Sequence, residues 1–164
     1  ENGIIRVYSS YRLRRDGFIM AIVYHNVLVA VDGSKEAERA FETAIDVSLR
    51  NDAKLIIAHV IDTRTFATVE AYDRTITERA ESYAKELLDE YVKTAQDRGV
   101  QEVEVAIEYG SPKVTIAKKL APNHDADLII CGATGLNAVE RFFIGSVSES
   151  ITRYAKCDVL IVRL

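Results

Sequence analysis

The chain has 164 residues, 48% of them apolar, which suits one domain with a sizeable hydrophobic core. Its net charge of −4 argues against a general nucleic-acid-binding protein, and no apolar run is long enough to span a membrane. The two cysteines, Cys131 and Cys157, lie in apolar runs and lack the C-x-x-C spacing of metal knuckles. We therefore expect buried free thiols in a cytoplasmic protein, with neither nucleic acid nor membrane as a partner.

Residues 1–19 differ in composition from the chain that follows. They carry four arginines against two acids, Glu1 and Asp16, and show no hydrophobic period. Met20 is the only methionine, and an organised pattern begins just after it. We interpret residues 1–19 as an upstream leader or a cloning-derived segment outside the fold, and residues 20–164 as the domain. A mitochondrial-type presequence is the alternative that their shortness disfavours.

Strands and helices alternate along the domain. Apolar runs predict strands at residues 27–31, 55–61, 103–109, 126–131 and 157–162, and the polar alternation of 103–109 indicates an edge strand. Amphipathic periods predict helices after Ser34 and over residues 75–98, 112–120 and 147–154. This order predicts an α/β fold, a single open parallel sheet with helices on both faces. In such sheets, ligands bind at the carboxyl ends of the strands where the strand order reverses.

The stretch between the fourth predicted strand and the last helix reads GATGLNAVERFFIGS. Its glycines are Gly132, Gly135 and Gly145, and Gly145 is followed by Ser146. A glycine at a strand end allows φ > 0 and a close approach to the backbone, and a helix start favours anions. Ser146 and Glu149 fit a capping box, so this hydroxyl could cap the helix, bind phosphate or do both. A turn and a helix cap alone would also explain these residues.

The spacing G-x2-G-x9-G-S resembles the motif of the nucleotide-binding branch of the universal stress protein family. The resemblance covers about residues 22–163 and includes VLVAVDGS, AHVID and GSVSESITRYAKCDVLIVR. It implies a Rossmann-like fold of the adenine nucleotide alpha hydrolase-like type, with five parallel strands in the order 3-2-1-4-5. Asp32 and Gly132 would then flank one crevice.

The resemblance also implies an adenine-nucleotide site at the strand ends and the start of the last helix. Its residues would be Ala30, Val31, Asp32, Val60, Cys131, Gly132, Gly135, Gly145, Ser146 and Val147. Asp32 would meet the adenine or ribose, and the backbone of Val60 would read the adenine. Gly132 and Gly135 would let the chain pass the ribose and phosphates, and residues 145–147 would hold phosphate oxygens. From the residues alone, Asp32 fits a turn or cap acid equally well.

Other notable side chains have structural interpretations. His59 lies within an apolar strand, where a hydrogen-bonded core histidine is the expectation, and Tyr83 and Tyr91 have the helical spacing of core residues. Arg141 lies in the glycine loop and could reach phosphate, although a solvated arginine explains it as well. The sequence contains no Walker A motif, no G-x-S-x-G and no histidine pair with metal-ligand spacing.

The resemblance favours a regulatory or stress-response protein that holds ATP, or else ADP or AMP, with Mg²⁺ on the phosphates. A slow ATPase or self-phosphorylating protein ranks lower, because no general base and no Mg²⁺-binding carboxylate pair stand out. A ligand-free dimeric interaction module is the third hypothesis, and the intact glycine motif counts against it. The resemblance implies a homodimer through residues 159–162, which would form an edge strand in the implied order.

Overall fold

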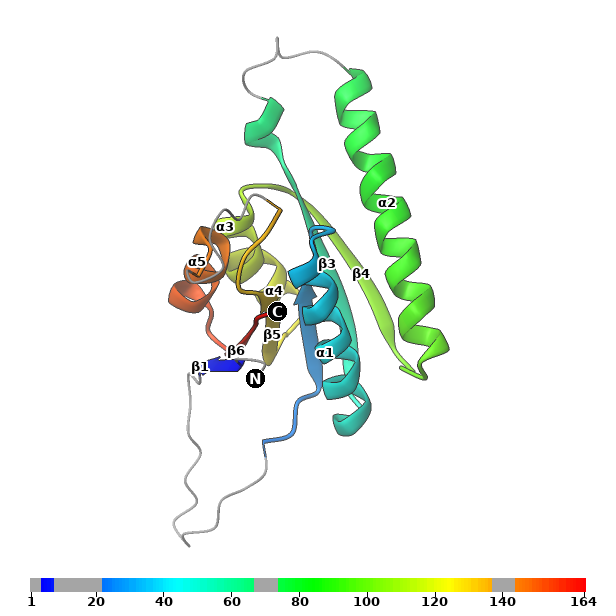
Figure 1. Cartoon of the computed structure of the whole chain (residues 1–164), viewed down its shortest axis with the longest axis vertical. Coiled ribbons are helices and arrows are strands. Elements are labelled where there is room, and N and C mark those ends of the chain that lie inside the picture. The colour runs from blue at the N-terminus through cyan, green and yellow to red at the C-terminus, as the bar shows by residue number, and fades with distance from the viewer. Residues whose placement is uncertain (1–3, 8–21, 67–73, 137–143) are drawn as a thin grey trace, which may run out of the picture.

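The computed structural model of the chain describes residues 4–7, 22–66, 74–136 and 144–164 (Figure 1). Its strands are β1 (Ile4–Val7), β2 (Asn26–Ala30), β3 (Lys54–Asp62), β4 (Val103–Gly110), β5 (Leu128–Gly132) and β6 (Asp158–Val162). Its α-helices are α1 (Lys35–Asn51), α2 (Arg74–Asp97), α3 (Pro112–Thr115), α4 (Ala121–Asn123) and α5 (Ser146–Tyr154). A 3₁₀ turn, η1 (Thr63–Phe66), follows β3, and a π-helical segment, η2 (Ile116–Leu120), joins α3 to α4.

The strands form one sheet in the order β1-β6-β5-β2-β3-β4. The five strands from β2 to β6 pair in parallel, so the predicted α/β class and the predicted order 3-2-1-4-5 of these strands are confirmed. The order reverses at β2, which pairs with β3 on one side and with β5 on the other. The alternating strand β4 lies at one edge of this sheet, as predicted.

Two helical layers cover the sheet because its central strands are apolar on both faces. Val27 and Val29 of β2 pack with α1 and α2 in one core, whereas Leu28 packs with η2 and α5 in the other. All three side chains are fully buried. Within α2, Tyr91 is buried as predicted, but the core prediction for Tyr83 is wrong. Tyr83 is half exposed, and its hydroxyl lies close to Gly33, just after β2.

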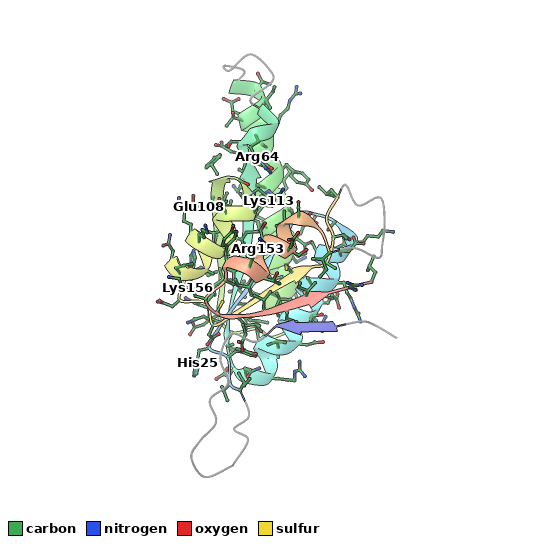
Figure 2. All side chains as sticks on the ribbon, turned by 90° about the vertical axis from the view of Figure 1, so that its left-hand side faces the viewer. His25, Arg64, Glu108, Lys113, Arg153 and Lys156 are labelled. Carbon is green, nitrogen blue, oxygen red and sulfur yellow. The ribbon has the colours of Figure 1, made fainter. Side chains whose placement is uncertain are left out.

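The outer edge of β6 differs from the expectation. β1 pairs with it in antiparallel register, from Ile4 opposite Val162 to Val7 opposite Val159. The two strands run side by side in opposite directions in Figure 2. Part of residues 1–19 therefore extends the sheet, and β6 is flanked on both sides instead of forming its edge. No hydrophobic period signalled this strand, because it has only four residues.

We expect a chain that starts at Met20 to fold with nearly the same stability as the full chain. The reason is that β1 adds one four-residue strand at an edge, while the five parallel strands pair without it. Urea unfolding at dilute concentration would compare the two free energies of unfolding. A loss above about 3 kcal/mol, the scale of a large core deletion, would contradict the prediction.

Candidate functional site

The candidate site lies at the carboxyl ends of β2, β3 and β5, where the strand order reverses. We call this region the switch point. From β2 the chain continues into α1 on one face of the sheet, and from β5 it leads to α5 on the other face. Loops leaving neighbouring strands toward opposite faces separate from one another, which is why ligands of open α/β sheets bind at such positions.

Asp32 lies at the switch point, two residues after the end of β2. Its Oδ1 accepts a hydrogen bond from the backbone N–H of Ser34 at 2.9 Å, across Gly33, whose φ of 83° suits glycine. Its other carboxylate oxygen faces the glycine loop, since a Cβ on Gly135 would lie 2.7 Å from Asp32 Oδ2. Both interpretations of Asp32 therefore hold in part. The carboxylate stabilises a turn with one oxygen and presents the other toward Gly135.

The next wall is β3, which continues past the end of β2. Ala30, the last residue of β2, pairs with Ala58, and β3 runs on to Asp62. The carbonyl of Ala58 accepts the N–H of Val31 at 2.9 Å, so the polar backbone groups of Ala58 point toward β2. Backbone direction alternates along a strand, which places the N–H and C=O of Val60 on the same side, beyond the end of β2. The backbone of Val60 is thus oriented toward the switch point.

His59 has a structural role, as predicted. Its Nδ1 lies 2.8 Å from the carbonyl oxygen of Val31, and its side chain is half-buried. This contact ties β3 to the residue that follows β2. The contact therefore holds β3 against the end of β2. Because Nδ1 is occupied by this hydrogen bond, it is not available as a reactive nitrogen.

Gly132 is the last residue of β5, and α1 packs directly over it. A Cβ at this position would lie 2.8 Å from Cβ of Glu36 and 3.0 Å from its carbonyl carbon. The need for glycine here therefore comes from close packing of the first turn of α1 against β5, and Gly132 does not adopt positive φ. The preceding Cys131 is buried, and burial raises the pKa of its thiol to about 12, so it is a packing residue and not a nucleophile.

The far end of the glycine loop is attached to the end of β5. The N–H of Gly145 donates to the carbonyl of Ala133 at 2.6 Å. The buried hydroxyl of Ser148 lies 2.7 Å from the same carbonyl and 2.8 Å from the carbonyl of Gly145. The amide of Gly145 is thus engaged within the protein. The sequence analysis missed Ser148. Its role differs from that of Ser146 in the motif only through the contact with Ala133, which the sequence does not show.

The start of α5 differs from the predicted capping box. Gly145 is the N-cap residue, and Ser146 is already the first helical residue, with an exposed side chain. Glu149 pairs with Arg153 at 2.8 Å instead of completing a capping box. The first N–H groups of the helix, those of Ser146 and Val147, lack intrahelical acceptors and carry the positive end of the helix dipole. The Ser146 hydroxyl is therefore exposed at the helix start and does not serve as the cap.

The start of α1 is less suited to an anion than the start of α5. Its N-cap is the buried Ser34, whose hydroxyl accepts from the N–H of Ala37 at 3.1 Å. Glu36 and Glu38 occupy its first turn, and both would repel a phosphate. The first turn of α5 carries one acid, Glu149, which pairs with Arg153, so of the two helices that begin at the switch point α5 repels a phosphate less.

Some expectations concern residues outside the part of the chain that the structure describes. Arg141 is one of them. Within the described ranges, no cluster of three or more His, Cys, Asp or Glu residues is arranged to hold a metal ion. In the same ranges, no helix combines the length and the apolar character that a membrane crossing would need. Cys131 and Cys157 are free thiols.

Comparison with known proteins decides the family. The model of the universal stress protein family matches residues 23–163. The chain belongs to the universal stress protein family. A universal stress protein of Staphylococcus aureus is 57% identical over 142 residues, which cover 87% of this chain and 86% of that protein. The structure of the universal stress protein UspA from Lactobacillus plantarum is similar at a TM-score of 0.78 and 31% identity, and the match covers 87% of this chain and 100% of that one.

Two similar universal stress proteins have been solved with adenine nucleotides. One is a complex with cAMP, at a TM-score of 0.66 and 28% identity over 87% of this chain and 98% of that one. The other is a complex of an Archaeoglobus fulgidus universal stress protein with dAMP, at a TM-score of 0.62 and 25% identity over 87% of this chain and 100% of that one. These two members of the family therefore bind adenine nucleotides.

Proposed function

We propose that this universal stress protein binds ATP, with ADP or AMP as alternatives, at the switch point of its sheet. The observation that carries the proposal is the convergence of three features there. They are the backbone of Val60, which is oriented toward the switch point, the second carboxylate oxygen of Asp32 and the N-terminus of α5. The complexes of similar proteins with cAMP and dAMP support an adenine nucleotide as the ligand.

In this proposal each wall recognises one part of the nucleotide. The backbone of Val60, beside Ala30 and Val31, supplies the donor and acceptor that an adenine ring requires. The free oxygen of Asp32 accepts from a ribose hydroxyl, as acids do in other dinucleotide sites. The N–H groups of Ser146 and Val147, with the Ser146 hydroxyl, meet the phosphates. Gly135 keeps the loop free of side-chain bulk opposite Asp32.

Mg²⁺ would accompany ATP on its phosphate oxygens. Mg²⁺ is often held by substrate phosphates and water with one or two carboxylates, so a dedicated protein cage is unnecessary. Asp32 is the described carboxylate that faces the site, and its role is recognition.

The function that we propose is that of a regulatory nucleotide-binding protein of the cytoplasm. A turnover assay with ATP would distinguish it from a slow ATPase.

Ser146→Ala tests the phosphate role of α5. We expect affinity for ATP to fall about tenfold, since a hydrogen bond to a charged group contributes about 1.5 kcal/mol or more. Affinity for adenosine should not change. The unfolding midpoint of the free protein should also stay, because Ser146 is not the N-cap. Calorimetric titration of ATP with Mg²⁺ and of adenosine into both proteins would measure these quantities.

Two outcomes of that titration would contradict the proposal at different levels. If the parent protein binds no adenine nucleotide even at millimolar concentration, the proposed function is wrong. If Ser146→Ala weakens ATP and adenosine equally, the site stands but the phosphate role of Ser146 does not.

We also propose that β6 is the surface through which two copies of the chain form a homodimer. Its apolar residues end the parallel part of the sheet, and a two-fold axis would pair this strand with itself in antiparallel orientation. Such a dimer requires the edge of β6 that faces β1. β1 must therefore leave β6 before the second copy can pair with it.

A further inference from the structure

β1 pairs with β6 in the way that a strand from a second molecule could. The two strands are antiparallel, whereas every other pair in the described sheet is parallel. All five residues of β6 are buried. Leu160 and Val162 lie in the core that contains α1, and Val159 and Ile161 lie in the core that contains α5. The backbone edge of β6 is therefore the part of this strand that a further strand can recognise.

The sequence of β1 resembles the end of the chain. β1 reads IIRV, and residues 161–164 read IVRL, with isoleucine and arginine at the same positions and apolar residues at the other two. In the observed register, residues 4, 5, 6 and 7 face residues 162, 161, 160 and 159. If residues 161–164 of a second copy replaced β1, Ile161 would face Val162 and Val162 would face Ile161. This arrangement is reciprocal, as a two-fold axis requires.

We propose that β1 occupies the place of a second copy's β6 and thereby controls homodimer formation. The inference rests on the homodimer proposed above. While β1 is paired, the edge is closed and the chain is a monomer. When β1 leaves, the same edge accepts the C-terminal strand of a second copy. The partner is another copy of this chain, and β1 is its intramolecular competitor.

The balance between the two states follows from the tether. β1 is joined to β2 by 18 residues, 8–25, so it meets β6 as part of the same molecule. Two segments of one chain that pair across a short connection have an effective concentration in the millimolar range. A second copy at micromolar concentration is far more dilute than this. With a strand of similar sequence it cannot displace β1, which therefore stays paired with β6. Yet β1 is only four residues long, so a modest change in it can release the edge.

Replacing Ile5 and Arg6 together by proline tests the proposal in the full chain. Adjacent residues of a strand direct their N–H groups to opposite sides, so one of the two prolines removes a donor toward β6 whichever residue faces it. The matched control is Tyr11→Pro with Arg12→Pro. It replaces a large apolar residue and an arginine outside the four paired residues.

Sedimentation velocity at about 10 µM, well below the millimolar effective concentration of an intramolecular pairing, would measure the outcome. We expect the parent and the control to sediment as monomers and the Ile5→Pro, Arg6→Pro variant as a dimer. A peptide with the sequence of residues 1–8, added at millimolar concentration, should return the variant to a monomer. The same peptide with prolines at positions 5 and 6 should have no effect.

Each contrary result overturns the proposal. A parent that is already dimeric shows that β1 does not close the edge. A variant that stays monomeric while keeping the circular dichroism of the parent shows that the released edge does not accept a second copy. A dimer that resists the peptide uses another surface. Nucleotide titration of the same proteins is independent of these results, so a failure of ATP binding can be told apart from a failure of strand competition.

Discussion

Gly132→Val is expected to destabilise the fold by about 3 kcal/mol, the upper part of the range for overpacking a close contact. The new Cβ would meet Cβ and the carbonyl carbon of Glu36 at 2.8 and 3.0 Å. Glu36 lies in the first turn of α1, whose backbone cannot yield without moving the helix from β5. The free energy of unfolding in urea would measure the loss.

Gly135→Ala is the matched control from the same motif. Its Cβ would approach the Asp32 carboxylate, the far end of a side chain that can rotate away. We expect its free energy of unfolding to stay within about 1 kcal/mol of the parent's, as for most substitutions away from the core. If Gly132→Val proved as stable as Gly135→Ala, the packing explanation of Gly132 would have to be given up.

Asp32→Asn is expected to weaken ATP and adenosine together, by about 10- to 100-fold. Asparagine keeps an oxygen that can accept the N–H of Ser34, so the turn after β2 should persist. The charged acceptor that faces Gly135 is lost, and a hydrogen bond to a charged group contributes about 1.5–3 kcal/mol. Calorimetric titration of both ligands would show whether the loss is common to them, in contrast to Ser146→Ala.

Asp127→Asn serves as the control for this substitution. Asp127 also accepts backbone N–H groups, from His25 at 2.7 Å and from Asn26 at 3.1 Å, but at the opposite end of the sheet. Its replacement should leave both affinities unchanged. If Asp32→Asn lowered the affinity for ATP alone, the carboxylate would act near the phosphates instead of the ribose.

Much of the fold follows from local sequence pattern. The apolar runs of β2 and β5 predict strands buried on both faces, and the alternation of β4 predicts an edge. The order of the strands did not come from these patterns. It followed from the family resemblance, because strand order depends on contacts between distant residues. β1 escaped prediction for a similar reason, since four residues cannot establish a period and only pairing with β6 makes them a strand.

The candidate site was predictable as a region but not in its contacts. The order of strand, glycine loop and helix located the start of α5 to within one residue. Ser146 and Ser148 are alike in type, and only the carbonyl of Ala133 selects Ser148 as the residue that closes the loop. The need for glycine at position 132 likewise comes from α1, which begins almost one hundred residues earlier in the chain.

The double attachment at Ala133 has a consequence for how members of this family can diverge. Gly145 and Ser148 connect the start of α5 directly to the end of β5 through hydrogen bonds to one carbonyl. Insertions in surface loops with anchored ends have a small entropic cost, because it grows only slowly with loop length. The length and sequence of the chain between residues 136 and 144 could therefore change among relatives while these hydrogen bonds keep the helix start in place. For the nucleotide site that we propose, selectivity among adenine nucleotides could then change separately from phosphate binding.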